Sequence, residues 1–204
     1  MGEDHPEHHP RHLPGAVAVG RLLYSAICSL DGYTADAAGS FDWAAPDEEV
    51  HAFVNDLERP VGSYIYGRRM YEVMRFWDSP ELASSDSSAM RDYAEIWQRA
   101  TKVVYSTTLD GVTTSRTRLE RAFDVDAVRD LVDTAPSEVS IGGPGLAAQA
   151  LRAGLVDEIN LLLVPAAVGG GTSVLPRDLR IDLDLRDEHR FPSGVVHLRY
   201  GVRR

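Results

Sequence analysis

Residues 140–147 read Ser-Ile-Gly-Gly-Pro-Gly-Leu-Ala and mark a point where a strand turns into a helix. A short apolar run at 138–141 precedes the glycines, and apolar residues recur after them at the spacing of one helix face. Glycine lets the backbone pass close to a ligand, and the first helical turn offers free N–H groups and a positive dipole end. The stretch is therefore either a pyrophosphate-binding junction or a tight turn that binds nothing.

A second strand-to-helix junction has the same design at residues 64–72, which read Tyr-Ile-Tyr-Gly-Arg-Arg-Met-Tyr-Glu. Arg68 and Arg69 would stand at the helix N-terminus, where positive charge is unfavourable for the helix dipole unless an anion lies there. The structural alternative is that these arginines pair with acids such as Glu72. Met70 is expected to pack rather than to react.

Apolar runs and helical patterns alternate along the rest of the chain, which predicts an α/β fold with a mostly parallel central sheet flanked by helices. The last two strands alternate apolar and polar residues, as an antiparallel C-terminal pair would. Strands are expected at 22–28, 61–66, 103–105, 119–123, 138–141, 158–164, 181–185 and 195–202. Helices are expected to begin near 47, 90, 124 and 144.

Composition limits the classes of partner. The 204 residues include 31 Asp and Glu against 21 Lys and Arg, a formal net charge of −10 that weighs against binding nucleic acid. No apolar run approaches the ~18–20 residues that a membrane span needs, and no apolar leader opens the chain, so a cytoplasmic protein is expected. The single cysteine, Cys28, excludes an internal disulfide and a Cys-rich zinc site, and is expected to pack in the core.

The chain divides into a tail and one domain. Residues 1–15 are rich in His and Pro and lack periodicity, which favours a flexible tail over a metal site. Residues 16–204 contain no internal linker or repeat and are expected to form a single domain. No metal site is predicted.

The loop after the first strand places Asp31 beside Gly32, at a strand end where ligands of open α/β sheets gather. Asp31 could orient a substrate, or it could form an Asx-turn with nearby backbone N–H groups, which is slightly preferred. His51 follows on the next helix and is expected at the surface or at the edge of a pocket.

Taken in order, six segments resemble the dihydrofolate-reductase-like family, and within it the RibD C-terminal type, the reductase domain of riboflavin biosynthesis. The resemblance extends over residues 22 to about 201. The matching segments are 29–33, 65–72, 102–106, 141–146, 154–158 and 164–171.

This resemblance implies an NADPH-dependent reductase that transfers hydride to a small pyrimidine- or pterin-type heterocycle, as in 5-amino-6-(5-phosphoribosylamino)uracil reductase or dihydrofolate reductase. It implies that residues 67–70 lie near one phosphate, 142–146 near the pyrophosphate and nicotinamide, and 106–108 near the adenosine ribose. The cofactor-binding residues would be Gly67, Arg68, Arg69, Met70, Ser106, Thr107, Ile141, Gly142, Gly143, Pro144, Gly145 and Leu146.

The chain departs from the family pattern in two places. Where the family often has a basic residue that reads the 2′-phosphate of NADP, Ser106 is followed by two threonines, and Arg116 or Arg118 could substitute. The proton-donating acid on the first helix of dihydrofolate reductases has no unique counterpart. Glu48 or its neighbour Glu49 lies in that vicinity, and Glu48 is taken with Asp31 as a catalytic candidate.

A homodimer is also expected, because residues 195–202 form a terminal strand that needs cover from another element or another chain. Two alternatives to the NADPH reductase stay open. One is a non-catalytic nucleotide-binding protein on the same scaffold, and the other is a reductase that uses a flavin or deazaflavin.

Overall fold

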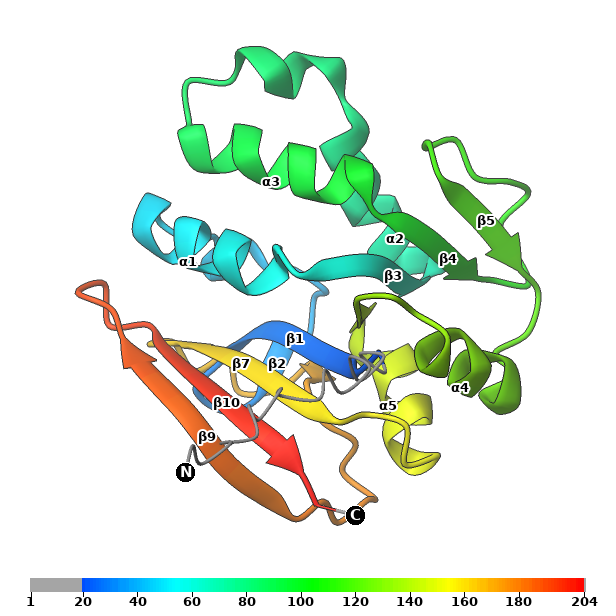
Figure 1. Cartoon of the computed structure of the whole chain (residues 1–204). Helices are drawn as coiled ribbons and strands as arrows, with labels where there is room; N and C mark the ends of the chain where they lie inside the picture. The colour runs from blue at the N-terminus through cyan, green and yellow to red at the C-terminus, as the bar shows by residue number, and fades with distance from the viewer. Residues whose placement is uncertain (1–19, 204) are drawn as a thin grey trace, which may run out of the picture.

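The computed structural model describes residues 20–203. Eight strands form one strongly twisted sheet with helices on both faces, and β2 and β8 form a separate two-stranded sheet (Figure 1). The strand order is β5-β4-β3-β6-β1-β7-β10-β9. The strands are β1 (Leu22–Ser29), β2 (Tyr33–Ala35), β3 (Val61–Gly67), β4 (Thr101–Tyr105), β5 (Thr117–Glu120), β6 (Glu138–Gly142), β7 (Glu158–Val164), β8 (Thr172–Ser173), β9 (Leu183–Arg190) and β10 (Val196–Val202).

The six strands from β5 to β7 pair in parallel, and β10 joins β7 and β9 in antiparallel pairs. This confirms the predicted α/β class with its antiparallel C-terminal strands. The α-helices are α1 (Glu48–Glu58), α2 (Arg68–Met74), α3 (Ser88–Arg99), α4 (Val125–Asp133) and α5 (Pro144–Arg152). Three 3₁₀ helices complete the elements: η1 (Asp42–Ala44), η2 (Arg75–Asp78) and η3 (Pro80–Ser84).

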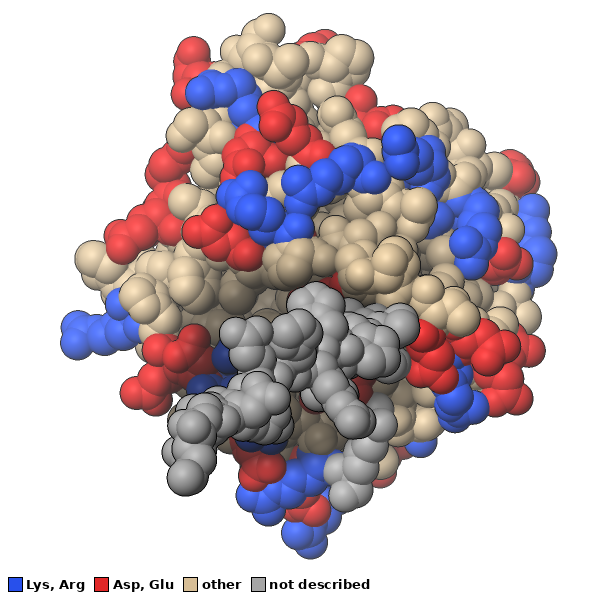
Figure 2. Space-filling model, in the orientation of Figure 1, with Lys and Arg blue, Asp and Glu red and all other residues tan. Residues whose placement is uncertain are grey.

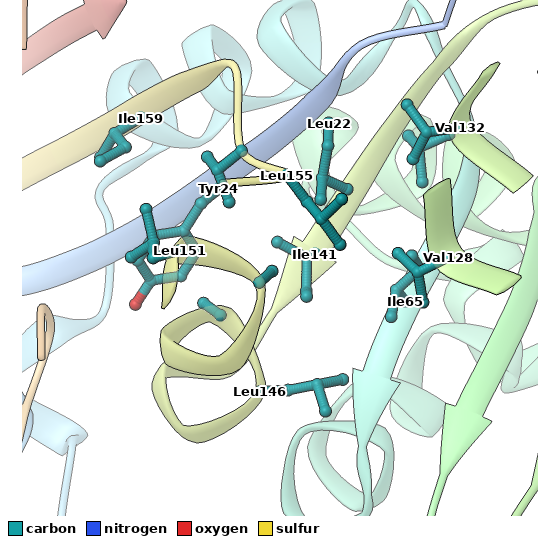
Figure 3. Close-up of a cluster of buried hydrophobic side chains, with 14 of the residues drawn as sticks. Leu22, Tyr24, Ile65, Val128, Val132, Ile141, Leu146, Leu151, Leu155 and Ile159 are labelled. Atoms are coloured by element: carbon teal, nitrogen blue, oxygen red, sulfur yellow. The ribbon is translucent and has the colours of Figure 1, made fainter. Parts of the chain in front are cut away.

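The larger core lies between the sheet and the pair α4 and α5 (Figure 3). Tyr24 of β1 and Ile141 of β6 meet Val128 of α4 and Leu151 of α5 there, and each of the two strand residues is fully buried. Cys28 belongs to this cluster at 0% exposure, which confirms that it packs in the core. Its burial raises the pKa of the thiol to about 11.

A second core lies on the other face, under α1 and α3. Trp97 of α3 is fully buried there and donates from Nε1 to Tyr66 Oη (3.2 Å), so the helix is attached to β3 by a specific contact. Asp47 and Ser87 begin these helices by accepting the N–H groups of Val50 (2.8 Å) and Met90 (3.1 Å). Both helices therefore have their N-termini fixed by side-chain caps.

Two predicted strands differ from the structure in their bounds, and one strand pair was not predicted. The strand expected at 119–123 is β5, which begins at Thr117. The strand expected at 181–185 is β9, which extends to Arg190. It lies at the edge of the sheet and its last six residues are exposed, so no apolar pattern marks them. The short pair β2 and β8 carries too few residues to show a period.

The C-terminal strand also differs in which face it buries. Its apolar positions are half-buried, whereas His197 between them is 0% exposed, because Phe53 of α1 covers it (ring centroids 4.9 Å apart). The strand is not the sheet edge, since β9 pairs along its length.

On the face that Figure 2 shows, basic and acidic side chains are interspersed. Ion pairs at the surface include Arg59–Asp92 (3.0 Å) and Arg118–Glu120 (3.2 Å), and such exposed pairs contribute little to stability. Within residues 20–203, no helix combines the length and the apolar character that crossing a membrane requires. The 1–15 tail lies outside the described residues.

Candidate active site at the carboxyl edge of the sheet

The parallel register brings the predicted junctions together. Gly67 pairs with Tyr105 of β4, and Tyr66 pairs with Gly142 of β6, so the three strands end at the same level. The segments 67–70, 106–108 and 142–146 therefore follow three adjacent strands at one edge of the sheet. This edge of an open α/β sheet is where ligands bind.

The three glycines of the 140–147 stretch differ in whether the structure requires a glycine at that position. A Cβ atom on Gly142 would lie 2.7 Å from Cε1 of Tyr66, so the packing of that ring requires glycine. Gly143 has φ +91°, which L side chains rarely adopt. A Cβ atom on Gly145 would meet nothing within 4 Å. Only this third glycine borders open space.

The helix that follows is a potential anion site. Gly145 and Leu146 lie in the first turn of α5, where helix geometry leaves their N–H groups without an intrahelical acceptor. Pro144 has no N–H and takes the first helical position without cost. The side chains of Ile141 and Leu146 are buried in the core, so these two residues present only backbone to the edge.

The junction after β3 offers the same opening. Gly67 has an ordinary extended conformation, and a Cβ atom there would meet nothing within 4 Å. Arg68 Nη1 donates to Thr108 Oγ1 (3.3 Å), and Arg68 Nε lies 3.5 Å from Glu72. The expected pairing with Glu72 thus exists. Arg68 also contacts Thr108, so it connects the junction after β3 with the turn after β4.

Two further residues of this junction play structural parts. Met70 packs against the junction at 140–147, since its Cγ would lie 3.2 Å from a Cβ atom on Gly142. Tyr71 is buried, and its hydroxyl oxygen accepts the N–H groups of Thr113 (2.9 Å) and Thr114 (3.3 Å). This contact fastens the loop between β4 and β5 onto α2.

The Asp31 carboxylate holds a distant loop. Its oxygens accept the backbone N–H groups of Val168 (3.1 Å) and Gly169 (2.7 Å), which follow β7. Hydrogen bonding by the Ser29 hydroxyl, and then by these two N–H groups, keeps the pKa of Asp31 below its usual range. The expected backbone contacts exist, but they are made to a loop far along the chain rather than within a local turn.

Glu48 caps another helix. Its carboxylate accepts from the Ser87 hydroxyl (2.8 Å), the Ser88 hydroxyl (3.3 Å) and the Ala89 N–H (3.1 Å) at the start of α3. The Ser87 hydroxyl, followed by the Ala89 N–H, lowers the pKa of Glu48. Both candidate carboxylates are therefore ionised hydrogen-bond acceptors in this structure.

His51, which the sequence placed at the surface or at the edge of a pocket, lies among aromatic side chains. It lies one turn after Glu48 on α1, half-buried, with its ring 5.6 Å from Trp77 and 5.9 Å from Tyr93 (centroid distances). Burial lowers the pKa of His51, and the charges of Glu48 and Asp92 act in the opposite direction. Its partners come from segments distant in sequence, so no local spacing could reveal the cluster.

Comparison with known proteins identifies the class of protein. The structure superposes on dihydrofolate reductase of Enterococcus faecalis, solved with NADP(H) and RAB-propyl, with a TM-score of 0.60 and 12% identity over 91% of this chain and 98% of the reductase. The fold is thus dihydrofolate-reductase-like. The sequence profile of the RibD C-terminal domain matches residues 21–196. The chain belongs to the RibD C-terminal domain family.

Two other relatives have nearly the same length as this chain. A protein of Shewanella sp. PV-4, provisionally assigned to riboflavin biosynthesis, superposes with a TM-score of 0.69 and 21% identity over 90% of this chain and 99% of its own. The uncharacterized protein YyaP of Bacillus subtilis (strain 168) is 22% identical over 182 residues, which are 88% of this chain and 94% of YyaP.

Proposed function

We propose that this protein is an NADPH-dependent reductase that transfers hydride to a pyrimidine- or pterin-type ring. One observation carries the proposal: Gly67 and Gly145 lie at neighbouring strand-to-helix junctions, and the fold itself requires a glycine at neither position. Where neither packing nor backbone conformation requires a glycine, its missing side chain would allow a ligand to approach the backbone closely. The NADP(H) complex of the E. faecalis reductase, on the same fold, supports this ligand class.

The residues present fit a dinucleotide. The first-turn N–H groups of Gly145 and Leu146 would bind phosphate oxygens, and the guanidinium of Arg68 would add a positive charge. The other proposed contacts come from the remaining residues of the three junctions: Arg69, Met70, Ser106, Thr107, Ile141, Gly142, Gly143 and Pro144. When bound, the nicotinamide supplies the hydride, and the protein supplies position and electrostatics.

On the substrate side, Asp31 and Glu48 act in this proposal as positioning groups. The Asp31 carboxylate holds the 168–169 backbone beside the end of β1, and Glu48 holds the start of α3 against α1. A proton donor must carry a proton near neutral pH, and neither lowered carboxyl pKa allows that. We propose instead that His51, one turn after Glu48 on α1, is the proton donor; because burial lowers its pKa as well, it would act in its protonated form below neutral pH.

A homodimer belongs to the proposal. Leu185 on the edge strand is 51% exposed and lies beside the half-buried Tyr200 of β10, which is its registered partner. A second copy of the chain would cover this outer apolar face. Light scattering of the wild type and of Leu185→Lys tests this: the wild type should have the mass of a dimer and the variant a lower one.

The test of the function has two parts. NADPH, NADH, a flavin and a deazaflavin are each titrated into the protein by calorimetry, with tryptophan fluorescence as a second readout. NADPH oxidation is then followed by absorbance with 5-amino-6-(5-phosphoribosylamino)uracil or dihydrofolate. Tight NADPH binding with turnover of either ring supports the proposal. Tighter flavin binding, or nucleotide binding without any turnover, would favour one of the two alternatives.

A further inference from the structure

Two arginines from different elements flank the turn formed by residues 106–109, which follows β4. Arg68, at the start of α2, donates to Thr108 Oγ1 (3.3 Å). From the β5 side, Arg121 Nη1 donates to the carbonyl oxygens of Ser106 (3.3 Å) and Leu109 (2.6 Å). The turn is thereby held between two guanidinium groups.

The strand register explains why Arg121 reaches this turn. The parallel pairing of β4 and β5 matches Tyr105 with Glu120, and the Ser106 N–H continues it by donating to the Glu120 carbonyl (2.9 Å). Arg121 is the next residue, so its backbone leaves the sheet at the same carboxyl edge. Since one Nη atom makes both carbonyl contacts, the other N–H groups of its guanidinium are available to a ligand.

The sequence suggested Arg116 or Arg118 as the residue that reads the 2′-phosphate of NADP, but both lie away from this turn. The carbonyl of Arg116 accepts the Lys102 N–H (2.8 Å) near the start of β4, roughly 15 Å along the strand from Arg121. Arg118 Nε is paired with Glu120 Oε1 (3.2 Å). These positions favour Arg121 over Arg116 and Arg118 as the substitute for the basic residue missing after Ser106.

The arginines around the turn have few ion-pair partners, although the carboxylates of Glu120 and Asp124 lie close enough to act on Tyr105 just before it. Among residues 20–203, neither Arg121 nor Arg69 forms an ion pair with a carboxylate. Arg68 has one such partner, Glu72, which is exposed and lies at the rather long distance of 3.5 Å. The Ser106 hydroxyl oxygen accepts the N–H groups of Thr108 (3.2 Å) and Leu109 (3.0 Å), which leaves its O–H as a donor. The Ser106 hydroxyl and the guanidinium groups of Arg68 and Arg121 could therefore donate to a negatively charged phosphate group here.

We propose that Arg121, together with Arg68 and the Ser106 hydroxyl, binds a phosphate monoester on the adenosine ribose and so makes the protein select NADPH over NADH. The inference rests on the proposed function, because it takes the 106–108 segment to lie beside that ribose. It adds the residues that recognise the phosphate, which the sequence could not identify. Arginine suits this part because its planar fork binds phosphate oxygens in pairs.

The test measures the affinity for NADPH and for NADH in four proteins: wild type, Arg121→Ala, Arg121→Lys and Arg118→Ala. The wild type should bind NADPH at least ~10-fold more tightly than NADH. In Arg121→Ala this ratio should fall toward one while NADH affinity changes little. Arg121→Lys, which retains the charge, should restore part of the ratio. The matched control Arg118→Ala removes an arginine three residues away and should retain the ratio in full.

Added salt should weaken NADPH binding to the wild type more than to Arg121→Ala, because the contact is an exposed charge pair. A wild-type ratio near one, or an unchanged ratio in Arg121→Ala, would overturn the inference while leaving the proposed function intact. Equal losses of NADPH and NADH affinity in Arg121→Ala would also overturn it, since Arg121 would then only hold the turn. Binding of neither nucleotide by the wild type would remove the proposed function itself.

Discussion

The ring of Tyr66 occupies the space that a side chain on Gly142 would need. A Cβ atom on Gly142 would lie 2.7 Å from Tyr66 Cε1 and 2.9 Å from Cδ1. Tyr66 cannot easily move, because it is 2% exposed and its hydroxyl accepts from Trp97 Nε1. The first glycine of the 140–147 stretch therefore serves the packing of the protein, although in sequence it looks like a ligand-binding glycine.

This relationship predicts a pair of coupled variants. Gly142→Ala should lower the free energy of unfolding by about 1–3 kcal/mol, because it overpacks a buried site. In the background Tyr66→Leu, which removes the ring edge, the same Gly142→Ala change should cost clearly less. Urea unfolding of the two single variants and the double variant measures this coupling. Additive losses would show that the ring is not what excludes a side chain.

Glu58 predicts how stability depends on pH. It is the last residue of α1, is 5% exposed and lies next to Tyr64, and its burial raises the pKa to about 7. The folded protein therefore holds a proton that the unfolded chain releases above about pH 4.5. The stability that this proton provides is present in full below that pH and is lost as pH rises through 7.

The free energy of unfolding should consequently fall by up to about 3 kcal/mol between pH 5 and pH 8 from this group. Glu58→Gln cannot titrate, so its stability should depend less on pH over the same range. Other titrating groups, such as His197, are common to both proteins and cancel in the difference. Parallel curves for wild type and variant would show that Glu58 does not titrate in this range.

Asp31 predicts a loop that can be released. Asp31→Ala removes the acceptor for the N–H groups of Val168 and Gly169. Hydrogen exchange at these two amides should speed up, and the KM for the ring substrate should rise while NADPH affinity stays the same. Asp31→Asn retains one acceptor oxygen and should show a smaller effect. Unchanged exchange at both amides would show that the loop is held by other contacts.

His51 predicts the pH profile of turnover. As the proton donor it must be protonated, so kcat should fall as pH rises through its pKa, which burial places below 6.5. His51→Gln should lower kcat about 100-fold and abolish this dependence, with the NADPH dissociation constant unchanged. If His51→Gln retains the same pH dependence, the proton comes from another group.

The sequence predicted β1, β6 and β7 well because each is a largely buried apolar run, whereas the polar, half-exposed β5 was predicted with the wrong bounds. The antiparallel end was predicted less accurately. The strand β9 is exposed over its last six residues, so hydrophobic pattern cannot mark its end. His197 occupies a polar position of the alternating pattern but is buried, because Phe53 from a distant helix packs against its ring and Asn160 of β7 forms a hydrogen bond with it (3.1 Å).

The candidate site was predicted in its backbone but not in all of its side chains. Glycine-to-helix junctions are local in sequence, so Gly67 and Gly145 could be recognised from their neighbours. Which glycine faces open space depends on Tyr66, which lies far away in the chain. We propose Arg121 and His51 for this site from strand register and helix packing, which no local spacing encodes.

The central claim is that the first turn of α5 binds the phosphates of NADPH, and Gly145→Glu tests it most directly. A Cβ atom at Gly145 would meet nothing within 4 Å, and an acidic residue in the first turn favours the helix dipole, so folding should not suffer. Gln149→Glu adds the same charge on the exposed second turn of the helix and serves as the matched control. The measurement is the calorimetric dissociation constant for NADPH, with a melting curve of each protein. We expect Gly145→Glu to weaken binding at least ~10-fold with an unchanged melting temperature and Gln149→Glu to bind as the wild type does. A folded Gly145→Glu protein with wild-type affinity would contradict the account.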